Sequence, residues 1–352
     1  MSLLQQTLQQ IQQVNRDTEL QTRTYVDSLA KPPQSLGKLE ELAVQMSAIT
    51  GEQFPKIDQK AVIVMAADHG VYEEGVTPNP QSTTVFQTLS FPKGTTGMCT
   101  IAKTTNAKVV AVDVGVMVDL PADAGIVLKK VKYGSDNMAK GPAMSREEAI
   151  RAIEVGIEVT TAQIEQGVNL VATGEMGIGN TTPSAAVLAV LHGCDPLEVT
   201  GMGAGVGPGG IEHKANVIRQ AIALNKPNAD DALDVLAKVG GLDNAGMTGT
   251  YLAAAANRVP VVVDGYISTV AALLACRLNP FVKDYLIASH MSEEPGAKIA
   301  AAMLGLEPVL HMNMRLGEGS GAALMFPILD AAISMLENMV TLANAAAVLE
   351  EV

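Results

Sequence analysis

The sequence predicts an α/β protein with a mostly parallel sheet in the middle of the chain and helical segments at both ends. Between residues 61 and 319, short runs rich in Val, Ile and Ala alternate with segments of helical periodicity. Each run is nearly continuous in apolar residues, as expected for strands that helices cover on both faces. The 352 residues are 48% hydrophobic and only 3% aromatic, a composition typical of a globular α/β or all-α protein.

The first 50 residues are predicted to form helices. Apolar residues recur at helical spacing from Leu4 to Val14 and again from Leu36 to Ile49. Lys31-Pro32-Pro33 separates the two stripes, because the residue before a proline is pushed out of the helical region. The first helix is rich in Gln and carries a single apolar stripe. It therefore needs a surface to pack on, either the body of its own subunit or a partner chain.

Five apolar runs in the middle of the chain are predicted to be strands. A helix over Ser145–Gln166 lies between two of them, because Ser145 and Glu148 form a capping box and Gly167 ends the periodicity. Another long apolar segment, Ala322–Met335, is predicted to be the last helix. The predicted strands are Ala61–Ala66, Lys108–Val114, Asn169–Thr173, Val259–Val263 and Asp284–Ala288.

An acid or a histidine follows each predicted strand. The carboxyl ends of parallel strands meet at one edge of a sheet, where α/β proteins bind ligands. The alternative is that Asp and Gly simply end strands and cap helices. Because the pattern occurs five times, it favours one shared cleft. The residues concerned are Asp68 with His69, Asp113, Glu175, Asp264 and His290.

Residues 174–180 form a glycine-rich loop between a predicted strand and a predicted helix. Thr182 is expected to cap that helix, with Pro183 at its first position. Backbone N–H groups at such a helix start attract anions. This loop is therefore predicted to bind a phosphate.

A second glycine-rich loop spans residues 201–210 and precedes a helix that carries Lys214. It is interpreted as a second phosphate or ribose contact, to which Lys214 adds positive charge, although a solvated lysine is an equal alternative. Gly205-x-Gly207-x-x-Gly210 formally matches the dinucleotide fingerprint. No good strand precedes it, however, and Pro208 removes an N–H group that such a turn supplies.

Glu318 lies between Gly317 and Gly319, directly before the last predicted helix. Glycines let the backbone approach a ligand closely, and the helix start offers free N–H groups. A carboxylate in this position is expected to reach into the cleft as a base. The alternative is an acid that caps the helix N-terminus.

Charge and motifs exclude several classes of protein. Acidic residues outnumber basic ones by 37 to 24, so a nucleic-acid-binding face is not expected. The sequence has no P-loop, no Gly-x-Ser-x-Gly elbow and no Cys/His cluster with metal-ligand spacing. Its three cysteines are far apart, as in a reduced compartment. With no signal peptide and no apolar run of roughly 20 residues, the protein is expected to be cytoplasmic and not membrane-bound.

Several motifs together resemble the nicotinate-nucleotide–dimethylbenzimidazole phosphoribosyltransferase family of the cobalamin lower-ligand pathway, in order along essentially the whole chain. The resemblance implies a Rossmann-like, mostly parallel sheet flanked by helices in a large domain of residues 56–319. It also implies a small helical domain built from residues 1–55 and 320–352, and a homodimer. The motifs are Lys31-Pro-Pro-x-Ser-Leu-Gly-x-Leu-Glu40, Ala67-Asp-His-Gly-Val71, Gly94-Thr-Thr-Gly97, Gly174-Glu-Met-Gly-Ile-Gly-Asn-Thr-Thr-Pro183, Asp264-Gly265 and Leu316-Gly-Glu-Gly-Ser-Gly-Ala322.

The same resemblance implies a reaction and a set of site residues. The family moves the ribose 5-phosphate of nicotinate mononucleotide onto a nitrogen of 5,6-dimethylbenzimidazole, which gives α-ribazole phosphate and nicotinate without a metal or cofactor. Glu318 matches the family's general base. Asn79 stands where a small hydroxyl residue is expected to contact the acceptor. The implied substrate-binding residues are Glu175, Lys214 and Asp264 for the phosphoribosyl and nicotinate groups, Gly177, Gly179, Asn180, Gly203 and Gly205 for the phosphate, Pro80, Gln87, Met314 and Leu316 for the acceptor ring, and Thr181 and Ser292.

Three alternative functions stay open from the sequence. The first is a related phosphoribosyltransferase that uses another acceptor, because related enzymes accept other benzimidazoles, purines or phenols. The glycine pattern of residues 205–210 leaves a nicotinamide-dependent dehydrogenase as a competing class. A non-catalytic nucleotide sensor is the third, although such a protein has no use for a base at Glu318. Whether Asp68, His69 and His290 contact a ligand is also open.

Overall fold

A computed structural model describes residues 1–345, apart from the side chain of Pro208, and contains one parallel sheet of six strands. The strand order is β3-β2-β1-β4-β5-β6. The chain therefore reverses its direction of winding between β1 and β4, as in dinucleotide-binding folds. The prediction of a mostly parallel sheet is confirmed. The strands are β1 (Lys60–Ala67), β2 (Lys108–Gly115), β3 (Val127–Leu128), β4 (Leu170–Met176), β5 (Val261–Val263) and β6 (Leu286–Ala288).

All five predicted strands form, but some of them begin or end at other residues than predicted. β6 begins at Leu286 because Pro280–Tyr285 forms a 3₁₀ helix, η3, capped by Asn279. β4 extends to Met176, so Glu175 belongs to the strand and pairs with Met65 of β1. The short strand β3 was not predicted, because two residues give no periodic signal.

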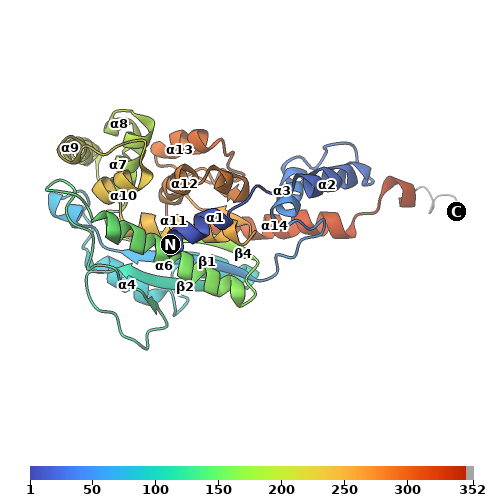
Figure 1. The fold of residues 1–352 in the computed structure, drawn as a ribbon, viewed down its shortest axis with the longest axis horizontal. Helices are drawn as coiled ribbons and strands as arrows, with labels where there is room; N and C mark the ends of the chain where they lie inside the picture. Colours follow the sequence, from blue (N-terminus) through green and yellow to red (C-terminus); the bar gives the residue numbers. More distant parts are fainter. Residues whose placement is uncertain (346–352) are drawn as a thin grey trace.

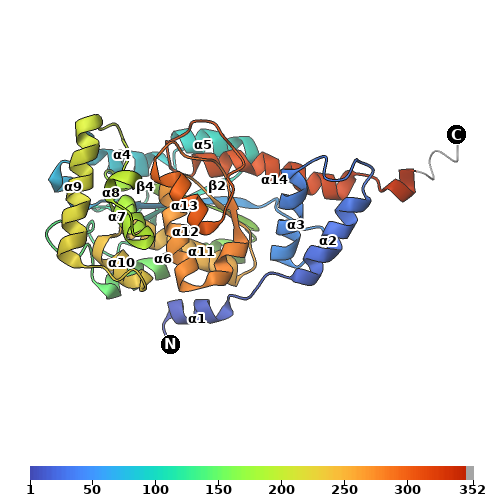
Figure 2. The ribbon, with the colours of Figure 1, turned by 90° about the horizontal axis from the view of Figure 1, so that it is seen from above.

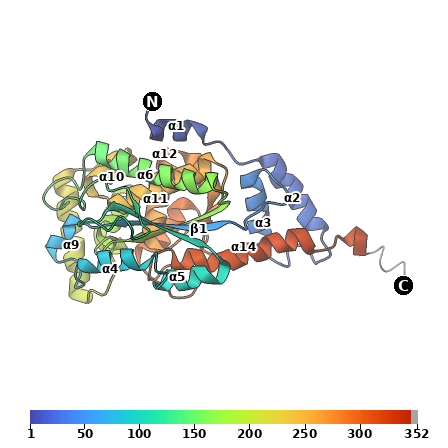
Figure 3. The ribbon, with the colours of Figure 1, turned by 90° about the horizontal axis from the view of Figure 1, so that it is seen from below.

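Helices cover both faces of the sheet, and the pleat of β1 divides its side chains between two apolar clusters (Figures 1 and 3). Ile63 and Met65 pack with α6 (Arg146–Glu165) and α11 (Leu242–Ala256). Val62 and Val64 point the other way, into the cluster that contains α14. This two-sided burial explains the nearly continuous apolar runs of the strands. The opposite face carries α4 (Ser82–Ser90), α5 (Gly97–Ala102) and α14 (Ser320–Asn338).

At one end of the molecule lie the helices α7 (Thr181–His192), α8 (Pro196–Val199), α9 (Pro208–Asn225) and α10 (Ala232–Val239), which follow β4, as Figure 2 shows. The 3₁₀ segments Gly70–Glu74 (η1) and Lys103–Thr105 (η2) follow β1 and α5. Of the remaining helices, α12 (Tyr266–Leu278) follows β5 and α13 (Gly296–Leu304) follows β6.

At the other end, α2 (Arg16–Ser28) and α3 (Lys38–Thr50) lie beside the C-terminal half of α14 (Figures 1 and 2). The Tyr25 hydroxyl donates to the Leu336 carbonyl oxygen at 3.2 Å. By length and composition α14 could cross a membrane, and it is the one such helix within residues 1–345. It is 61% buried, as expected for a core helix.

The first helix, α1 (Leu3–Gln10), lies on α6 and α11 and not beside α2 and α3 (Figure 3). The Leu4 N–H donates to Glu154 of α6 at 3.2 Å. The helix was predicted to continue to Val14, which is wrong, because the backbone turns extended at Ile11. The helix thus packs on the body of its own chain, while the division into a large and a small domain stays a prediction.

Candidate active site

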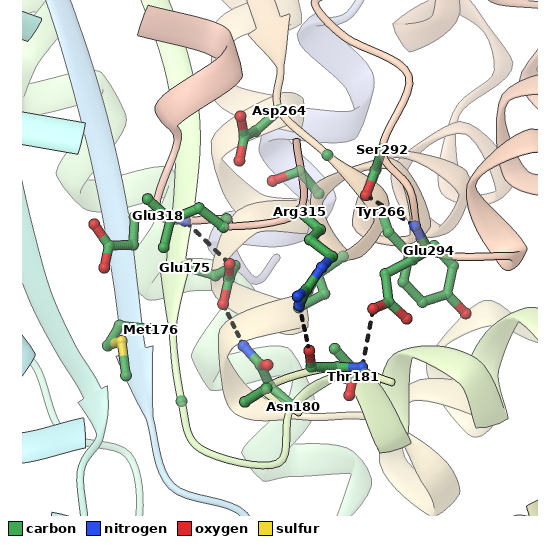
Figure 4. Close-up of a pocket in the computed structure, with 18 of the residues that line it drawn as sticks. Glu175, Met176, Asn180, Thr181, Asp264, Tyr266, Ser292, Glu294, Arg315 and Glu318 are labelled. Carbon is green, nitrogen blue, oxygen red and sulfur yellow. Dashed lines mark hydrogen bonds between the residues drawn. The ribbon is translucent and has the colours of Figure 1, made fainter. Parts of the chain in front are cut away.

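A cleft of about 600 Å³ opens at the carboxyl ends of β4, β5 and β6 (Figure 4). This volume lies within the range of small-molecule sites. Most of the predicted site residues, drawn from six separate segments of the chain, meet there. Those that line it are Gln87, Glu175, Gly177, Asn180, Thr181, Gly203, Gly205, Asp264, Ser292, Leu316 and Glu318.

Four predicted site residues do not line the cleft. Gly179 provides a left-handed turn (φ +91°) before α7, and Pro80 directly follows the lining residue Asn79. Met314 accepts a backbone hydrogen bond from Glu293 at 3.1 Å. Lys214 lies beneath the second glycine loop and is 2% exposed.

The prediction of one cleft shared by five strand ends is right for three of them. Asp68, after β1, instead accepts the Met117 N–H at 2.8 Å. Asp113, within β2, forms an ion pair with Lys130 at 2.9 Å. His69 is fully buried away from the cleft, whereas His290 lines it. The strand order explains the difference, because β4, β5 and β6 form one half of the sheet.

Glu318 sits in a strained turn at the cleft wall. Gly317, Glu318 and Gly319 all have left-handed backbones, with φ of +84°, +63° and +91°. A side chain on Gly319 would meet a Val62 methyl group at 2.6 Å, so only glycine is accommodated there. The turn therefore brings the Glu318 carboxylate to the cleft at a conformational cost.

The Glu318 carboxylate has polar partners on two other elements. Its Oε2 accepts the Met98 N–H of α5 at 3.5 Å, and its Oε1 accepts from the Gln87 amide of α4 at 3.3 Å. Burial raises the pKa of Glu318, and the Met98 N–H opposes that shift. A raised pKa suits a general base that must hold a proton near neutral pH.

Asp264 holds the start of the helix that follows Glu318. Its two oxygens accept the N–H groups of Gly319 at 3.1 Å, Gly321 at 2.8 Å and Ala322 at 3.0 Å. The sequence suggested that free N–H groups at the start of α14 would stabilise Glu318. Asp264 instead accepts hydrogen bonds from these N–H groups. Burial raises the pKa of Asp264, and His290 opposes that shift.

Glu175 lies next to the Glu318 turn and is linked to a second buried acid. Its Oε1 accepts the Glu318 N–H at 3.2 Å, and its Oε2 accepts from the Asn180 amide (Figure 4). The same amide also donates to Asp243 at 3.1 Å. Burial, with the Asp243 charge second, raises the pKa of Glu175 to about 8. Glu175 is thus mostly protonated at neutral pH in the free protein.

Two buried side chains, Lys214 and Glu294, hold the second glycine loop in place. The Lys214 ammonium donates to the Thr181 hydroxyl at 2.9 Å and to the Gly201 carbonyl at 3.2 Å. Burial lowers its pKa to about 8, and the Glu294 charge opposes that shift. Glu294 accepts the Gly203 N–H at 2.9 Å.

Two further side chains reach this loop from across the cleft. Asn79 donates to the Ala204 carbonyl at 2.8 Å. Arg315, labelled in Figure 4, donates to the Gly203 carbonyl at 3.2 Å. Glu294 and Arg315 were not predicted as site residues. Arg315 precedes Glu318 by three residues, and its charge within that motif was the available signal.

The helix α7 beside the cleft begins differently from the prediction. Thr182 was expected to cap α7, but the helix begins at Thr181 and Asn180 occupies the cap position. Pro183 is therefore the third helical residue. Neither α7 nor α12 has a side-chain cap. Gly265 occupies the cap position of α12, and the first residues of that helix line the cleft. Uncapped N–H groups at such a start attract anions.

The loop that matches the dinucleotide fingerprint lacks the preceding strand that a dinucleotide-binding dehydrogenase requires. Gly205–Gly210 follows the helix α8 and leads into α9, whereas the fingerprint requires a strand directly before the loop. Within residues 1–345 the structure also groups no three His, Cys, Asp or Glu side chains that could hold a metal ion.

Comparisons with known proteins define the class. A phosphoribosyltransferase family profile matches residues 11–347, nearly the whole chain. The chain therefore belongs to this phosphoribosyltransferase family.

Its relatives narrow the class further. The chain is 57% identical to the nicotinate-nucleotide–dimethylbenzimidazole phosphoribosyltransferase of Alkaliphilus metalliredigens, with 98% of this chain and 99% of the relative covered. It is 48% identical to the enzyme of that name from Clostridioides difficile, over 97% and 98% of the two chains. The crystal structure of the Thermus thermophilus enzyme superposes with a TM-score of 0.90 at 40% identity, covering 94% of this chain and 98% of that one. The recognition made from the motifs is confirmed.

Proposed function

We propose that this enzyme transfers the 5-phosphoribosyl group of nicotinate mononucleotide to 5,6-dimethylbenzimidazole, with Glu318 as general base. The observation that carries the proposal is the Glu318 carboxylate, buried at the cleft wall on a strained turn and held by Gln87 and Met98. Strain of this kind concentrates at functional sites. The names of relatives that match over nearly the full length support the substrates.

The reaction needs one proton acceptor and a site that tolerates a developing cation. One acceptor nitrogen attacks the anomeric carbon while the bond to the pyridinium nitrogen breaks, and that bond's electron pair stays on the departing nicotinate. The proton on the other acceptor nitrogen passes to Glu318, a step worth about 10²–10⁴-fold in rate. The ribose carbon becomes positively charged as the bond breaks, and nearby carboxylates stabilise that charge.

The donor is proposed to lie between the glycine loops and the start of α12. Gly177, Gly203 and Gly205 line this side of the cleft, and the α12 N–H groups favour a phosphate. Lys214 adds positive charge from beneath the loop, and Arg315 lines the cleft itself. A cationic pyridinium next to Glu175 would favour loss of its proton, which leaves a carboxylate beside the sugar.

The acceptor is proposed to lie near Gln87, Leu316 and Glu318, which share one wall. Asn79 faces the same cleft but donates to Ala204, on the donor side. A different base or a phenol as preferred acceptor is the second candidate, because Asn79 replaces the expected small hydroxyl residue.

The proposed reaction is tested by nicotinate release from nicotinate mononucleotide, with and without dimethylbenzimidazole, and by the mass of the riboside product. Glu318→Gln is expected to abolish transfer while donor affinity stays within a few fold, because the amide keeps the shape and loses the base. The exposed neighbour Glu293 does not line the cleft, and Glu293→Gln should keep normal turnover. Near-normal turnover in Glu318→Gln would refute the base. A panel of acceptors separates the two candidates.

We also propose that the enzyme works as a cytoplasmic homodimer, with residues 1–55 and 320–352 as its small domain, from which α1 departs to pack on the large one. Of these residues, 346–352 lie outside the part of the chain that the structure describes. Phe86 and Leu316 support an interface near the cleft, since they are 68% and 57% exposed and carry large apolar side chains. The packing of α1 on its own chain removes one earlier reason to expect a dimer. Light scattering on purified protein measures the assembly, and a monomer at assay concentration would contradict this part.

A further inference from the structure

The turn that carries Glu318 needs an external restraint. Glu318 itself has φ of +63°, a conformation that residues with a Cβ atom rarely adopt. A side chain on Gly174 of β4 would strike the Glu318 carbonyl oxygen, so the turn also rests directly on the strand. A strained backbone persists only where its surroundings fix it.

Asp264 supplies most of that restraint. Its carboxylate accepts three backbone N–H groups from residues 319–322, at 2.8–3.1 Å, on the C-terminal side of Glu318. Asp264 is 3% exposed, and both of its oxygens are engaged. Bonds from N–H groups to a buried carboxylate are stronger than bonds between neutral groups. Asp264 therefore has little capacity left to bind a substrate.

His290 holds Asp264 from the other side. Its Nδ1 lies 3.1 Å from the Ser289 hydroxyl and 3.8 Å from Asp264 Oδ1. Two glycines make room for the imidazole, because a Cβ on Gly265 would come within 3.2 Å of the ring and one on Gly321 would strike it. The ring and the carboxylate thus occupy fixed places between β5, β6 and α14.

We propose that Asp264 is a positioning residue that holds the Glu318 turn in its left-handed shape, with His290 packed behind it. In this role Asp264 contacts neither substrate and acts on the reaction through Glu318. The inference rests on the proposed function, and it reassigns a residue that the family resemblance placed among the substrate ligands.

The test is Asp264→Asn, whose amide nitrogen would face backbone N–H groups and cannot accept from them. We expect kcat to fall about 10- to 100-fold, as for loss of a group that orients a catalytic residue. The Kd for nicotinate mononucleotide should stay within threefold. Hydrogen exchange at the amides of residues 319–322 should become faster. A tenfold or greater loss of donor affinity with unchanged exchange would show a substrate contact and overturn the proposal.

Asp113→Asn is the matched control. Asp113 is also a buried aspartate near a strand end, accepts the Val116 N–H at 2.8 Å and lies outside the cleft. Both substitutions remove buried hydrogen bonds and are expected to lower the Tm. Only Asp264→Asn should lower kcat, so a similar kcat loss in the control would mean that general destabilisation explains the effect.

A second variant covers the case in which Asp264→Asn does not fold. Gly321→Ala places a methyl group against the ring of His290, which lines the cleft, and keeps the Asp264 side chain itself. It should lower kcat without weakening donor binding, and full kcat in the folded variant would contradict the proposal. Hydrogen exchange needs no substrate. It therefore tests whether Asp264 restrains the Glu318 turn even if the wild-type enzyme shows no transfer to dimethylbenzimidazole.

Discussion

Glu175 and Glu318 are two buried acids in contact, and their different partners separate their roles. Glu318 accepts hydrogen bonds from Met98 and Gln87, on helices across the cleft. Glu175 is bonded to Asn180, which it shares with Asp243. Burial, together with the nearby Asp243 charge, raises the pKa of Glu175 to about 8. At the residue scale, the site therefore combines the proposed proton acceptor, Glu318, with an acid that starts out neutral.

The Glu175 pKa predicts a pH-dependent effect on stability. The folded protein keeps this proton up to a pKa of about 8, whereas an unfolded glutamate loses it near 4.5. The stabilisation from Glu175 is therefore full below about pH 4.5 and is lost as the pH rises through 8. Glu175→Gln avoids that loss, so its Tm relative to wild type should rise between pH 5 and pH 9 in scanning calorimetry. The exposed Glu165→Gln should show no such trend, and parallel Tm curves for Glu175→Gln would contradict the assignment.

At the scale of elements, the second glycine loop is a short segment held by side chains from several others. Lys214 comes from α9, Glu294 from the loop after β6, and Arg315 from the loop before α14. Asn79 adds a bond to Ala204 from the loop before α4. In the proposed function, these bonds order the loop before the donor arrives, which lowers the entropy cost of binding.

Asn79→Ala should therefore raise the donor KM about 3- to 10-fold, since one hydrogen bond is worth about 0.5–1.5 kcal/mol. The acceptor KM should change little. Initial rates with each substrate varied in turn make the measurement. Asn228 accepts from Asp230 outside the cleft, so Asn228→Ala is a suitable control. A change in the acceptor KM alone would show that Asn79 contacts the acceptor and does not order the glycine loop.

At the scale of the whole molecule, the sheet joins distant parts of the chain into one body. α14 begins at the active site, packs against β4 and β5 on one face of the sheet and ends beside α2 and α3 (Figures 1 and 3). α1 crosses to the opposite face and covers α6 and α11. The N-terminal residues thus contribute to the stability of the large α/β body although they lie far from the cleft.

Leu4→Ala tests that contribution. Leu4 is buried against the body of the same chain, and shortening a buried Leu costs about 2–5 kcal/mol. The Tm should fall by several degrees, independently of protein concentration. Leu20 is 68% exposed on α2, and Leu20→Ala should leave the Tm nearly unchanged. A loss that appears only on dilution would instead place α1 at an interface between subunits.

Features that depend on neighbours along the chain were predictable from the sequence. The apolar runs located five strands, because strands buried on both faces need continuous apolar residues. The capping box at Ser145 located the start of α6 within one residue. The glycines around Glu318 marked a turn that brings backbone close to other groups, and the structure has it. Each of these signals lies within a few residues of the feature it predicts.

Contacts between distant segments were decided only by the tertiary structure. Strand order determined that the ends of β4, β5 and β6 share a cleft while Asp68 and Asp113 do not. Packing likewise placed the start of α5 against Glu318. It also placed the Asp264 carboxylate where it accepts hydrogen bonds from the N–H groups at the start of α14. Local patterns specify which groups need partners, but many segments offer compatible partners. Only the simultaneous packing of both sheet faces selects one set, because each buried polar group must then be satisfied by what lies next to it.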